Sequence, residues 1–404
     1  PRYGNNSWYK EMVLEAHRQG LKVIKDEVPN HWSSKHWMIQ DLPTATWIHQ
    51  FDEFTRSSYR TSTQFDPHAS RTDQKASADG WFDTTMPDMN QQNPLLLTYL
   101  IQNTIWWIEY AHLDGLRVDT YSYNDKEAIA KWTKAIMTEY PNLNIVGEVW
   151  MHDQAQMAYW QKDSPVSKIQ SYNSHLPMVM DFTLQDALTV AFNETEQKWD
   201  KGLYRIYDNL TMDFLYAEPS NTLIFAENHD TDRFNEYCPK LEDYKLLMTL
   251  LATMRGIPQL YYGSELLMKG ISNPDGWVRL DFPGGWAGDK KNAFTEMGLT
   301  NDESDFLHYV QTLGAFRTKS SALKTGNMMQ YIPEDGLYVY FRYDNNQTVM
   351  CVMNTDTKSR NVNLSKYGER TNLFKSGKDI ITGNIIGSEF SIPSMSMQVI
   401  ELIK

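Results

Sequence analysis

Residues 113–120, LDGLRVDT, decide the fold class, because they have the composition of a short buried strand that ends in a carboxylate at Asp119. The segment before them begins at Pro94, repeats apolar residues with helical spacing, and has proline at a favourable first-turn position. A helix is predicted again at residues 127–139, and a strand at residues 144–149. This order is typical of parallel βαβ units.

The alternation extends in both directions from this stretch. Repeated strand–helix units predict an α/β protein, either a doubly wound sheet or a (β/α) barrel. From about residue 326 the pattern changes to short strands separated by Pro, Asp-Gly and Asn-Asn turns, which indicates a small all-β domain. The other predicted helices are residues 8–19, 184–192, 204–216, 241–255 and 302–320, and the other predicted strands are residues 21–28, 178–182, 222–226 and 258–262.

Composition excludes several classes of protein. A net charge of −13 disfavours non-specific binding to nucleic acid, whose phosphates require clustered Lys and Arg. No apolar run is long enough to span a bilayer, so membrane insertion is not expected. Cys238 and Cys351 alone give neither a disulfide framework nor a zinc pattern. Aromatic residues make up 13% of the chain, and flat aromatic faces suit sugar rings, although large cores also use them.

Three predicted strands each end in a carboxylate, namely Asp119, Glu148 and Asp230. In a barrel such ends converge on one face, where active sites are built. Each acidic residue taken alone could equally cap the following helix. Three together, each with particular neighbours, favour a catalytic interpretation.

The neighbours of these carboxylates suggest different roles. Arg117 lies two residues before Asp119, so both side chains should point to the same face of the strand, where the guanidinium would keep Asp119 ionised for nucleophilic attack. Glu148 is flanked by Gly147, Val149 and Trp150, an apolar setting expected to raise its pKa as a general acid requires. His229 beside Asp230 could bind hydroxyl groups, and no metal site is predicted there.

These segments resemble the signature regions of the α-amylase superfamily, family 13 of the glycoside hydrolases. The resemblance runs from Pro1 to about residue 320 and is weaker in the β-rich tail. The matching segments are VPNHW at residues 28–32, MPDMN at 86–90, DGLRVDT at 114–120, GEVW at 147–150, ENHDTDR at 227–233 and YYGSE at 261–265.

The resemblance implies a role for each matching residue. Asp119 would attack the anomeric carbon, Glu148 would protonate the leaving oxygen and later activate water, and Asp230 would hold hydroxyls of the distorted sugar. It also implies that His31, Arg117 and His229 bind the sugar by hydrogen bonds. In such a double displacement the nucleophile and the acid are about 5–5.5 Å apart. Among the loop tryptophans, Trp150 and Trp286 are further candidates for stacking on glucose rings, although each could instead pack within its loop.

The resemblance is strongest to the neopullulanase and cyclomaltodextrinase branch, as in starch-utilisation enzymes of Gram-negative gut bacteria. Residues 120–123, TYSY, replace a Lys-His pair that endo-acting α-amylases usually carry there, which implies a different leaving-group side. The expected activity is retaining hydrolysis of α-1,4-glucosidic bonds in maltooligosaccharides, cyclodextrins or pullulan, with transglycosylation as an additional outcome. Two alternatives stay open, a non-catalytic α-glucan-binding protein on this fold and a truncated inactive fragment.

The resemblance also implies a TIM-type (β/α)8 barrel, of which six strands can be counted. PRYG at residues 1–4 resembles the segment after the second strand, so the first two strands and any N-terminal β domain are expected to precede residue 1. The predicted domains are residues 1–31 as the start of this barrel, 32–93 as an irregular excursion after the third strand, 94–325 as the rest of the barrel, and 326–404 as a C-terminal antiparallel β domain.

The remaining expectations concern partners and place in the cell. The expected partner is an α-glucan oligosaccharide, with no nucleic acid, and the branch leaves a homo-oligomer open. No cofactor is required; a structural calcium ion occurs in many relatives, but none is predicted here. The resemblance favours a periplasmic or secreted protein.

Overall fold

The computed structural model describes residues 4–404, so the first three residues of the PRYG segment lie outside the described part. The chain forms two compact units. The first contains the chain up to Met180 together with residues 214–221, and the second contains residues 181–213 and 222–404.

The first unit is built on parallel strands in the order β1 (Ile24–Glu27), β2 (Gly115–Val118), β3 (Asn144–Gly147) and β4 (Met178–Met180). The register places Glu27 opposite Val118, and Val118 opposite Gly147. The strands therefore end at the same level, and the residues that follow them are delivered to one edge of the sheet.

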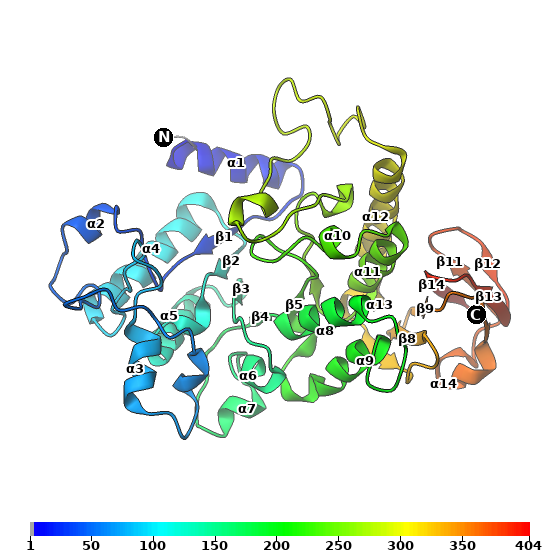
Figure 1. Ribbon diagram of the computed structural model, residues 1–404, viewed down its shortest axis with the longest axis horizontal. Helices are drawn as coiled ribbons and strands as arrows, with labels where there is room; N and C mark the ends of the chain where they lie inside the picture. The colour runs from blue at the N-terminus through cyan, green and yellow to red at the C-terminus, as the bar shows by residue number, and fades with distance from the viewer. Residues whose placement is uncertain (1–3) are drawn as a thin grey trace. The chain divides into compact units, whose positions relative to one another are not determined.

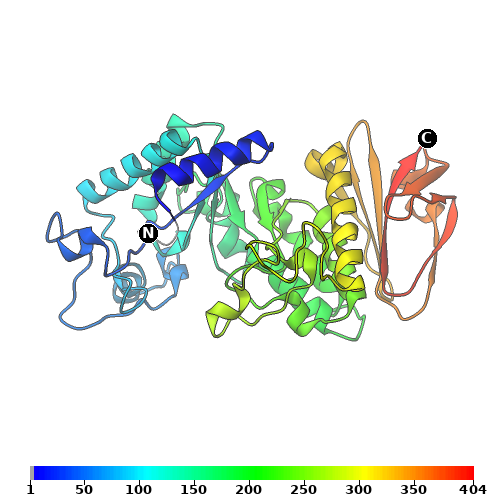
Figure 2. The ribbon, with the colours of Figure 1, turned by 90° about the horizontal axis from the view of Figure 1, so that it is seen from above.

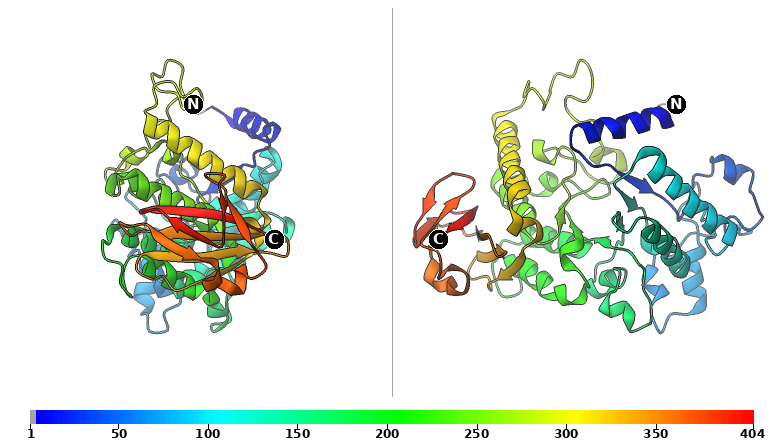
Figure 3. Two further views of the ribbon diagram at one scale, coloured as in Figure 1. Left: turned by 90° about the vertical axis from the view of Figure 1, so that its right-hand side faces the viewer. Right: turned by 180° about the vertical axis from the view of Figure 1, so that it is seen from behind.

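Helices alternate with these strands, as the periodicity predicts. Helix α4 begins at the predicted proline, and the Asn93 side chain caps it by accepting the Leu95 N–H at 2.9 Å. Helix α1 lies beside α4 (Figure 3, right). The helices of this layer are α1 (Asn6–Arg18), α4 (Pro94–Ala111), α5 (Lys126–Glu139), α6 (Gln154–Ala158) and α7 (Pro165–Lys168).

The excursion at residues 32–93 is less irregular than predicted. It contains the helices α2 (Trp37–Gln40) and α3 (Arg71–Asp79), the second capped by the Ser70 hydroxyl. Isolated backbone bridges also join its two ends, His31 with Asp88 and Ile48 with Met89. The excursion therefore leaves the end of β1 and returns to it, which periodicity alone could not reveal.

The second unit contains the short parallel strands β5 (Thr222–Ile224) and β6 (Ile257–Pro258) with their helices. Among the predicted boundaries that differ in this unit, residue 182 was assigned to a strand but begins α8. The Asp181 carboxylate accepts the Leu184 N–H at 3.0 Å and so starts the helix two residues early. The helices are α8 (Phe182–Asn193), α9 (Leu203–Thr211), α10 (Phe234–Tyr237), α11 (Leu241–Thr253), α12 (Asn301–Lys319) and α13 (Ser321–Thr325).

The same unit ends in an antiparallel sheet, seen face-on in Figure 3 (left). Its order is β12 (Ile385–Ile386), β11 (Ser376–Asp379), β14 (Ser396–Ile403), β9 (Thr348–Asn354), β8 (Leu337–Tyr343) and β7 (Asn327–Gln330). A separate antiparallel pair joins β10 (Arg360–Asn363) to β13 (Glu389–Ile392). The predicted C-terminal β structure is thus present.

Helices and C-terminal sheet share one core in this unit. Figure 2 shows α12 running alongside the sheet, and α11 contacts β14. Leu250 of α11 belongs to the same buried cluster as Tyr340, Cys351 and Val399 of the sheet. At this interface the hydroxyls of Thr253 and Tyr340 are 2.5 Å apart. The sheet therefore supplies part of the hydrophobic core of the helical layer.

The architecture is an α/β fold with parallel strands and a C-terminal antiparallel β domain (Figure 1). The two compact units divide the chain at Met180, within the predicted barrel region. This division follows other boundaries than the predicted domains, which therefore stay predictions. Among the described residues, none of the helices is both long and apolar enough to cross a bilayer.

Candidate active site

Two of the predicted carboxylates are adjacent in the first unit, directly after neighbouring strands. Asp119 follows β2 and Glu148 follows β3. The Asp119 N–H donates to the Glu27 carbonyl at 2.8 Å, and the Glu148 N–H donates to the Val118 carbonyl at 2.9 Å. The parallel ladder thus extends one residue beyond each strand and fixes both backbones.

Arg117 bridges the two carboxylates. Its Nη1 donates to Asp119 Oδ1 at 2.6 Å, and its Nη2 lies 3.0 Å from Glu148 Oε1. The second contact is an ion pair only, because Nη2 is not aligned for a hydrogen bond with any acceptor. Because one rigid guanidinium touches both, the two contacted oxygens are within roughly 8 Å of each other.

A third carboxylate, Asp26 of β1, completes the surroundings of Arg117. Its two oxygens accept from Nη1 at 2.9 and 3.1 Å, and β1 pairs Asp26 directly opposite Arg117. Burial opposes the charged guanidinium, but Glu148, Asp26 and Asp119 together outweigh burial and raise the pKa of Arg117. Arg117 is therefore permanently charged at the centre of this group.

The structure corrects the expected surroundings of Glu148. Its side chain is buried, with 5% of its area exposed, as the apolar flanks predicted. Its carboxylate, however, is next to Arg117, and its Oε2 accepts the Thr120 N–H at 2.8 Å. The sequence neighbours gave a wrong expectation here because residues 147–150 belong to the strand itself, whereas Arg117 and Thr120 come from the adjacent segment.

Thr120 contacts both carboxylates through an unusual backbone conformation. Its φ of 46° lies in the left-handed region, which a β-branched residue rarely adopts. In this conformation its N–H reaches Glu148, and its hydroxyl donates to Asp119 Oδ2 at 3.1 Å. Strain of this kind persists where surrounding contacts over-determine it, which is common at functional sites.

His31 lies at the edge of the same group, with Nε2 4.0 Å from Asp119 Oδ2. The imidazole stacks on the Phe82 ring, with centroids 4.7 Å apart. Burial lowers the pKa of His31, although the charge of Asp119 opposes this. At neutral pH a neutral imidazole can donate one hydrogen bond to a hydroxyl.

Aromatic residues that the sequence analysis did not select stand around the carboxylates. Phe82 of the excursion lies edge-on to Tyr123 and to Tyr59, at centroid distances of 5.6 and 5.4 Å. Burial and the charge of Glu148 raise the pKa of Tyr123 to about 12, so its hydroxyl is a donor at neutral pH. Tyr123 belongs to the TYSY segment that was expected to alter substrate recognition.

Asp88 connects the excursion to the residues that follow β1. Its backbone pairs with His31, its carbonyl accepts the His49 N–H, and its carboxylate lies 2.7 Å from His49 Nδ1. Burial raises the pKa of Asp88 to about 7, against the hydrogen bond and charge of His49. The pair therefore retains a proton near neutral pH and holds the segment that presents His31.

Asp230 and His229 form a second group, in the second unit. Arg279 donates from Nη2 to Asp230 Oδ1 at 2.7 Å and from Nε to the His229 carbonyl at 3.1 Å. His229 Nε2 lies 3.1 Å from Asp230 Oδ2. Both oxygens of Asp230 thus have partners. Arg279 was not predicted, and its only sequence signal was Asp275, four residues earlier, with which it forms an ion pair at 2.9 Å.

A buried network supports the loop that carries this second group. Glu227 accepts hydrogen bonds from the Phe234 N–H and the Ser264 hydroxyl, both at 2.5 Å. It also accepts from the Tyr244 hydroxyl and from Arg233 Nη1, both at 3.2 Å. Arg233 has no exposed side-chain surface and stacks over the Tyr261 ring at 3.9 Å. Both ends of residues 227–233 are therefore anchored, with His229 and Asp230 between them.

The two tryptophans predicted to stack on sugar belong to different units. Trp150, two residues after Glu148, is 38% exposed, and Trp286 of the second unit is 66% exposed. Both side chains are thus partly exposed to solvent, and stacking on a sugar ring stays a prediction. Within residues 4–404, no three His, Cys, Asp or Glu side chains are grouped as metal ligands would be.

Taken together, the first group offers a carboxylate positioned for attack and a second carboxylate able to exchange a proton, joined by one arginine. Hydrolysis of a glycosidic bond uses such a pair. The structure brings together Asp119, Glu148, Arg117 and His31 in one group, and Asp230 with His229 in another.

Comparison with known proteins agrees with this chemistry. Residues 1–314 match the family model of the α-amylase catalytic domain, and residues 328–401 match the cyclo-malto-dextrinase C-terminal domain. The chain is 25% identical to alpha-amylase 3 of Dictyoglomus thermophilum over 90% of its own length and 74% of that enzyme. It is 25% identical to a cyclomaltodextrinase of Geobacillus thermopakistaniensis, again over 90% of this chain but only 56% of the relative.

The fold is likewise that of solved amylases. An α-amylase from Geobacillus thermoleovorans, crystallised with acarbose, superposes with a TM-score of 0.80 at 24% identity, covering 100% of this chain and 82% of that one.

Proposed function

Because the chain belongs to the α-amylase catalytic-domain family, we propose that it hydrolyses α-1,4-glucosidic bonds of maltooligosaccharides, cyclodextrins or pullulan with retention of configuration. The observation that carries the proposal is the Arg117 bridge, which holds Asp119 and Glu148 side by side. Transfer of the glycosyl group to a second sugar is a further outcome of the same intermediate.

In the first step an oxygen of Asp119 attacks the anomeric carbon, and the bond from that carbon to the leaving oxygen breaks. Glu148 gives its proton to the leaving oxygen. Arg117 and the Thr120 hydroxyl hold the Asp119 carboxylate in position by hydrogen bonds. Binding of a neutral sugar displaces water from this buried group, so the proton transfer takes place away from bulk solvent.

In the second step Glu148, now a carboxylate, takes a proton from water as the water oxygen attacks the same carbon. The bond to Asp119 breaks, and the sugar leaves with its original configuration. If a sugar hydroxyl replaces water, the product is a longer glucan.

Residues outside the pair bind the sugar. The neutral His31 and the Tyr123 hydroxyl are donors beside the pair. We assign Asp230 to the hydroxyls of the sugar as positive charge develops on its ring, with His229 as its partner. Arg279 orients Asp230 by direct contact at 2.7 Å.

The substrate class rests on the relatives and on the aromatic surroundings. The C-terminal match is to a cyclomaltodextrinase domain. Phe82, Tyr59 and Tyr123 form an aromatic cluster in which Phe82 also stacks on His31, and sugar rings pack against aromatic surfaces of this kind. Comparing product profiles from cyclodextrin, pullulan and starch under one set of conditions would rank the three substrates.

Release of maltose or glucose from maltoheptaose tests the proposal. Asp119→Asn should lose release by at least about 10⁴-fold, because an amide cannot form the glycosyl ester. Asp114→Asn is the matched control, since Asp114 lies at the other end of the same stretch and binds Val23 and His17. Equal release by the wild type and Asp119→Asn would refute the assignment, and no release by either would leave only glucan binding.

A further inference from the structure

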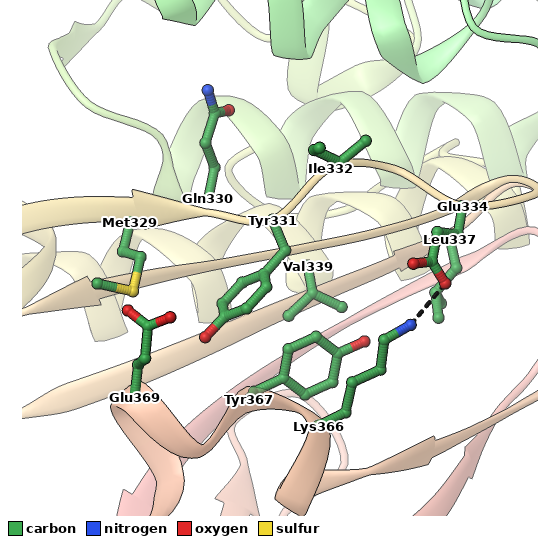
Figure 4. A pocket seen from close by; sticks show the side chains of 10 residues that line it. All are labelled: Met329, Gln330, Tyr331, Ile332, Glu334, Leu337, Val339, Lys366, Tyr367 and Glu369. Carbon is green, nitrogen blue, oxygen red and sulfur yellow. Dashed lines mark hydrogen bonds and ion pairs between the residues drawn. The ribbon is translucent and has the colours of Figure 1, made fainter.

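The C-terminal β domain contains a cavity that the proposed reaction does not use. Its volume is about 360 Å³, within the range of small-ligand pockets. It lies between β7, β8 and the segment formed by the short helices η7 (Leu364–Tyr367) and α14 (Gly368–Thr371). Figure 4 shows side chains from both sides pointing into it.

The floor and one wall of the cavity are apolar and aromatic. Val339 and Tyr367 are buried at 2% and 3% exposure and form the floor. Tyr331 stands edge-on to Tyr367, with ring centroids 4.9 Å apart and an angle of 87° between the rings. The two rings make a corner, against which the apolar face of a sugar ring can pack.

One polar atom in this corner lacks a partner. The Tyr331 hydroxyl oxygen is buried and makes no hydrogen bond with any described residue. Burial and the charge of Glu369 raise the pKa of Tyr331, so the hydroxyl keeps its proton. An unsatisfied buried hydroxyl is costly, and a ligand that supplies a hydrogen-bond partner recovers that free energy.

The rim of the cavity carries charged side chains in a mixed arrangement. Lys366 Nζ lies 2.5 Å from Glu334 Oε2 on one side, and Glu369 stands on the other (Figure 4). The excess negative charge opposes phosphates and carboxylates. The carboxylates and the ammonium group can instead hydrogen-bond to neighbouring hydroxyls of a neutral ligand.

We propose that this cavity binds one neutral sugar ring, a glucosyl unit of an α-glucan, at a site separate from the catalytic carboxylates. The aromatic corner packs against the ring, the Tyr331 hydroxyl bonds to one of its hydroxyls, and Glu369 binds another. The choice of an α-glucan rests on the proposed function, whereas the choice of a neutral sugar follows from the cavity itself.

Affinity electrophoresis in native gels that contain glycogen measures this binding without requiring hydrolysis. Tyr331→Phe removes only the unpaired hydroxyl, and Glu369→Ala removes an exposed carboxylate, so both variants should fold. Each should weaken binding to glycogen about fivefold, the effect of one lost hydrogen bond. The control Tyr343→Phe removes a hydroxyl outside the cavity, at the end of strand β8, and should bind like the wild type.

Two further readouts separate a binding role from a structural one. Without sugar, Tyr331→Phe should melt at or above the wild-type temperature, because its hydroxyl has no partner to lose. With maltoheptaose its rise in melting temperature should be smaller than that of the wild type. Release of maltose from maltotriose should be unchanged in both cavity variants.

The proposal is overturned if Tyr331→Phe and Glu369→Ala bind glycogen as tightly as Tyr343→Phe. It survives a failure of the proposed function, because glycogen retardation that depends on Tyr331 can be observed in a chain that hydrolyses nothing.

Discussion

At the scale of single residues, Arg117 is the side chain that contacts both carboxylates of the first group. Its position two residues before Asp119 was enough to predict that the two side chains meet, because alternate residues of a strand share a face. Its contact with Glu148 was not predictable, since that depends on which strands pair and in what register. The sequence therefore selected residues that the structure brings together, but it placed Glu148 in surroundings that were too apolar.

Replacing Arg117 by Lys should lower kcat for maltotriose at least about 100-fold, because an ammonium is a point charge that cannot bridge two carboxylates as a planar guanidinium does. Steady-state kinetics check this. Arg56→Lys, at an exposed ion pair with Asp83, should leave kcat unchanged. A full-rate Arg117→Lys enzyme would mean that the bridge is not required.

The Asp88–His49 pair should make stability depend on pH. Burial raises the pKa of Asp88 to about 7. Burial alone would lower the pKa of His49. The hydrogen bond and charge of Asp88, together with the charge of Asp79, outweigh burial and raise the pKa of His49. Groups whose pKa is raised by folding stabilise the fold below their unfolded values, and that contribution is lost as pH rises through the folded values. The melting temperature should therefore fall between pH 6 and 8, a window set by the cited value.

Asp88→Asn should flatten this fall, because an amide cannot ionise. Each kcal/mol of stability corresponds to roughly 2–4 °C in a unit of this size. Thermal melts at fixed scan rate measure it, with Asp83→Asn as an exposed control whose lowered pKa lies outside the window. A wild-type melting temperature that is constant from pH 6 to 8 would contradict the assignment.

At the scale of elements, local signals located most helices and strands. Helix α4 began at the predicted Pro94, and α5 and β3 were within two residues of prediction at each end. The excursion was harder, because its order comes from contacts between distant residues, such as His49 with Asp88. The loop at residues 227–233 was recognised from its sequence, but the network that holds it was not.

Glu227→Gln tests that network. It removes the charge that faces the fully buried Arg233, and breaking such a pair costs about 3–5 kcal/mol. The variant should melt at a lower temperature, and kcat should fall because His229 and Asp230 lose their support. Glu236→Gln, an exposed change on α10, is the control. Unchanged melting and kcat in Glu227→Gln would show that the loop holds its shape without the network.

At the scale of the whole molecule, the sequence distinguished the α/β part from the C-terminal β part. It did not predict that helices and sheet share a hydrophobic core. The change of pattern near residue 326 marks where strand β7 begins, at Asn327. The shared core of α11 with β8, β9 and β14 could not be inferred, because periodicity reveals which face of an element is apolar and not what covers it.

A chain ending at residue 326 should therefore aggregate, since removing the sheet exposes the buried face of α11, including Leu250 and Thr253. Sedimentation velocity of the shortened and complete chains checks this. A monomeric, cooperatively melting shortened chain would indicate that the sheet is an independent appendage.

In the proposed reaction Asp119 and Glu148, held together by Arg117, cleave the bond by double displacement. Proton NMR of the first product formed from maltoheptaose, recorded before mutarotation, tests it most directly. Double displacement predicts that the α-anomer appears first and that Asp119→Asn produces none. Initial formation of the β-anomer would mean a single displacement by water, and the assignment of Asp119 as nucleophile would be wrong.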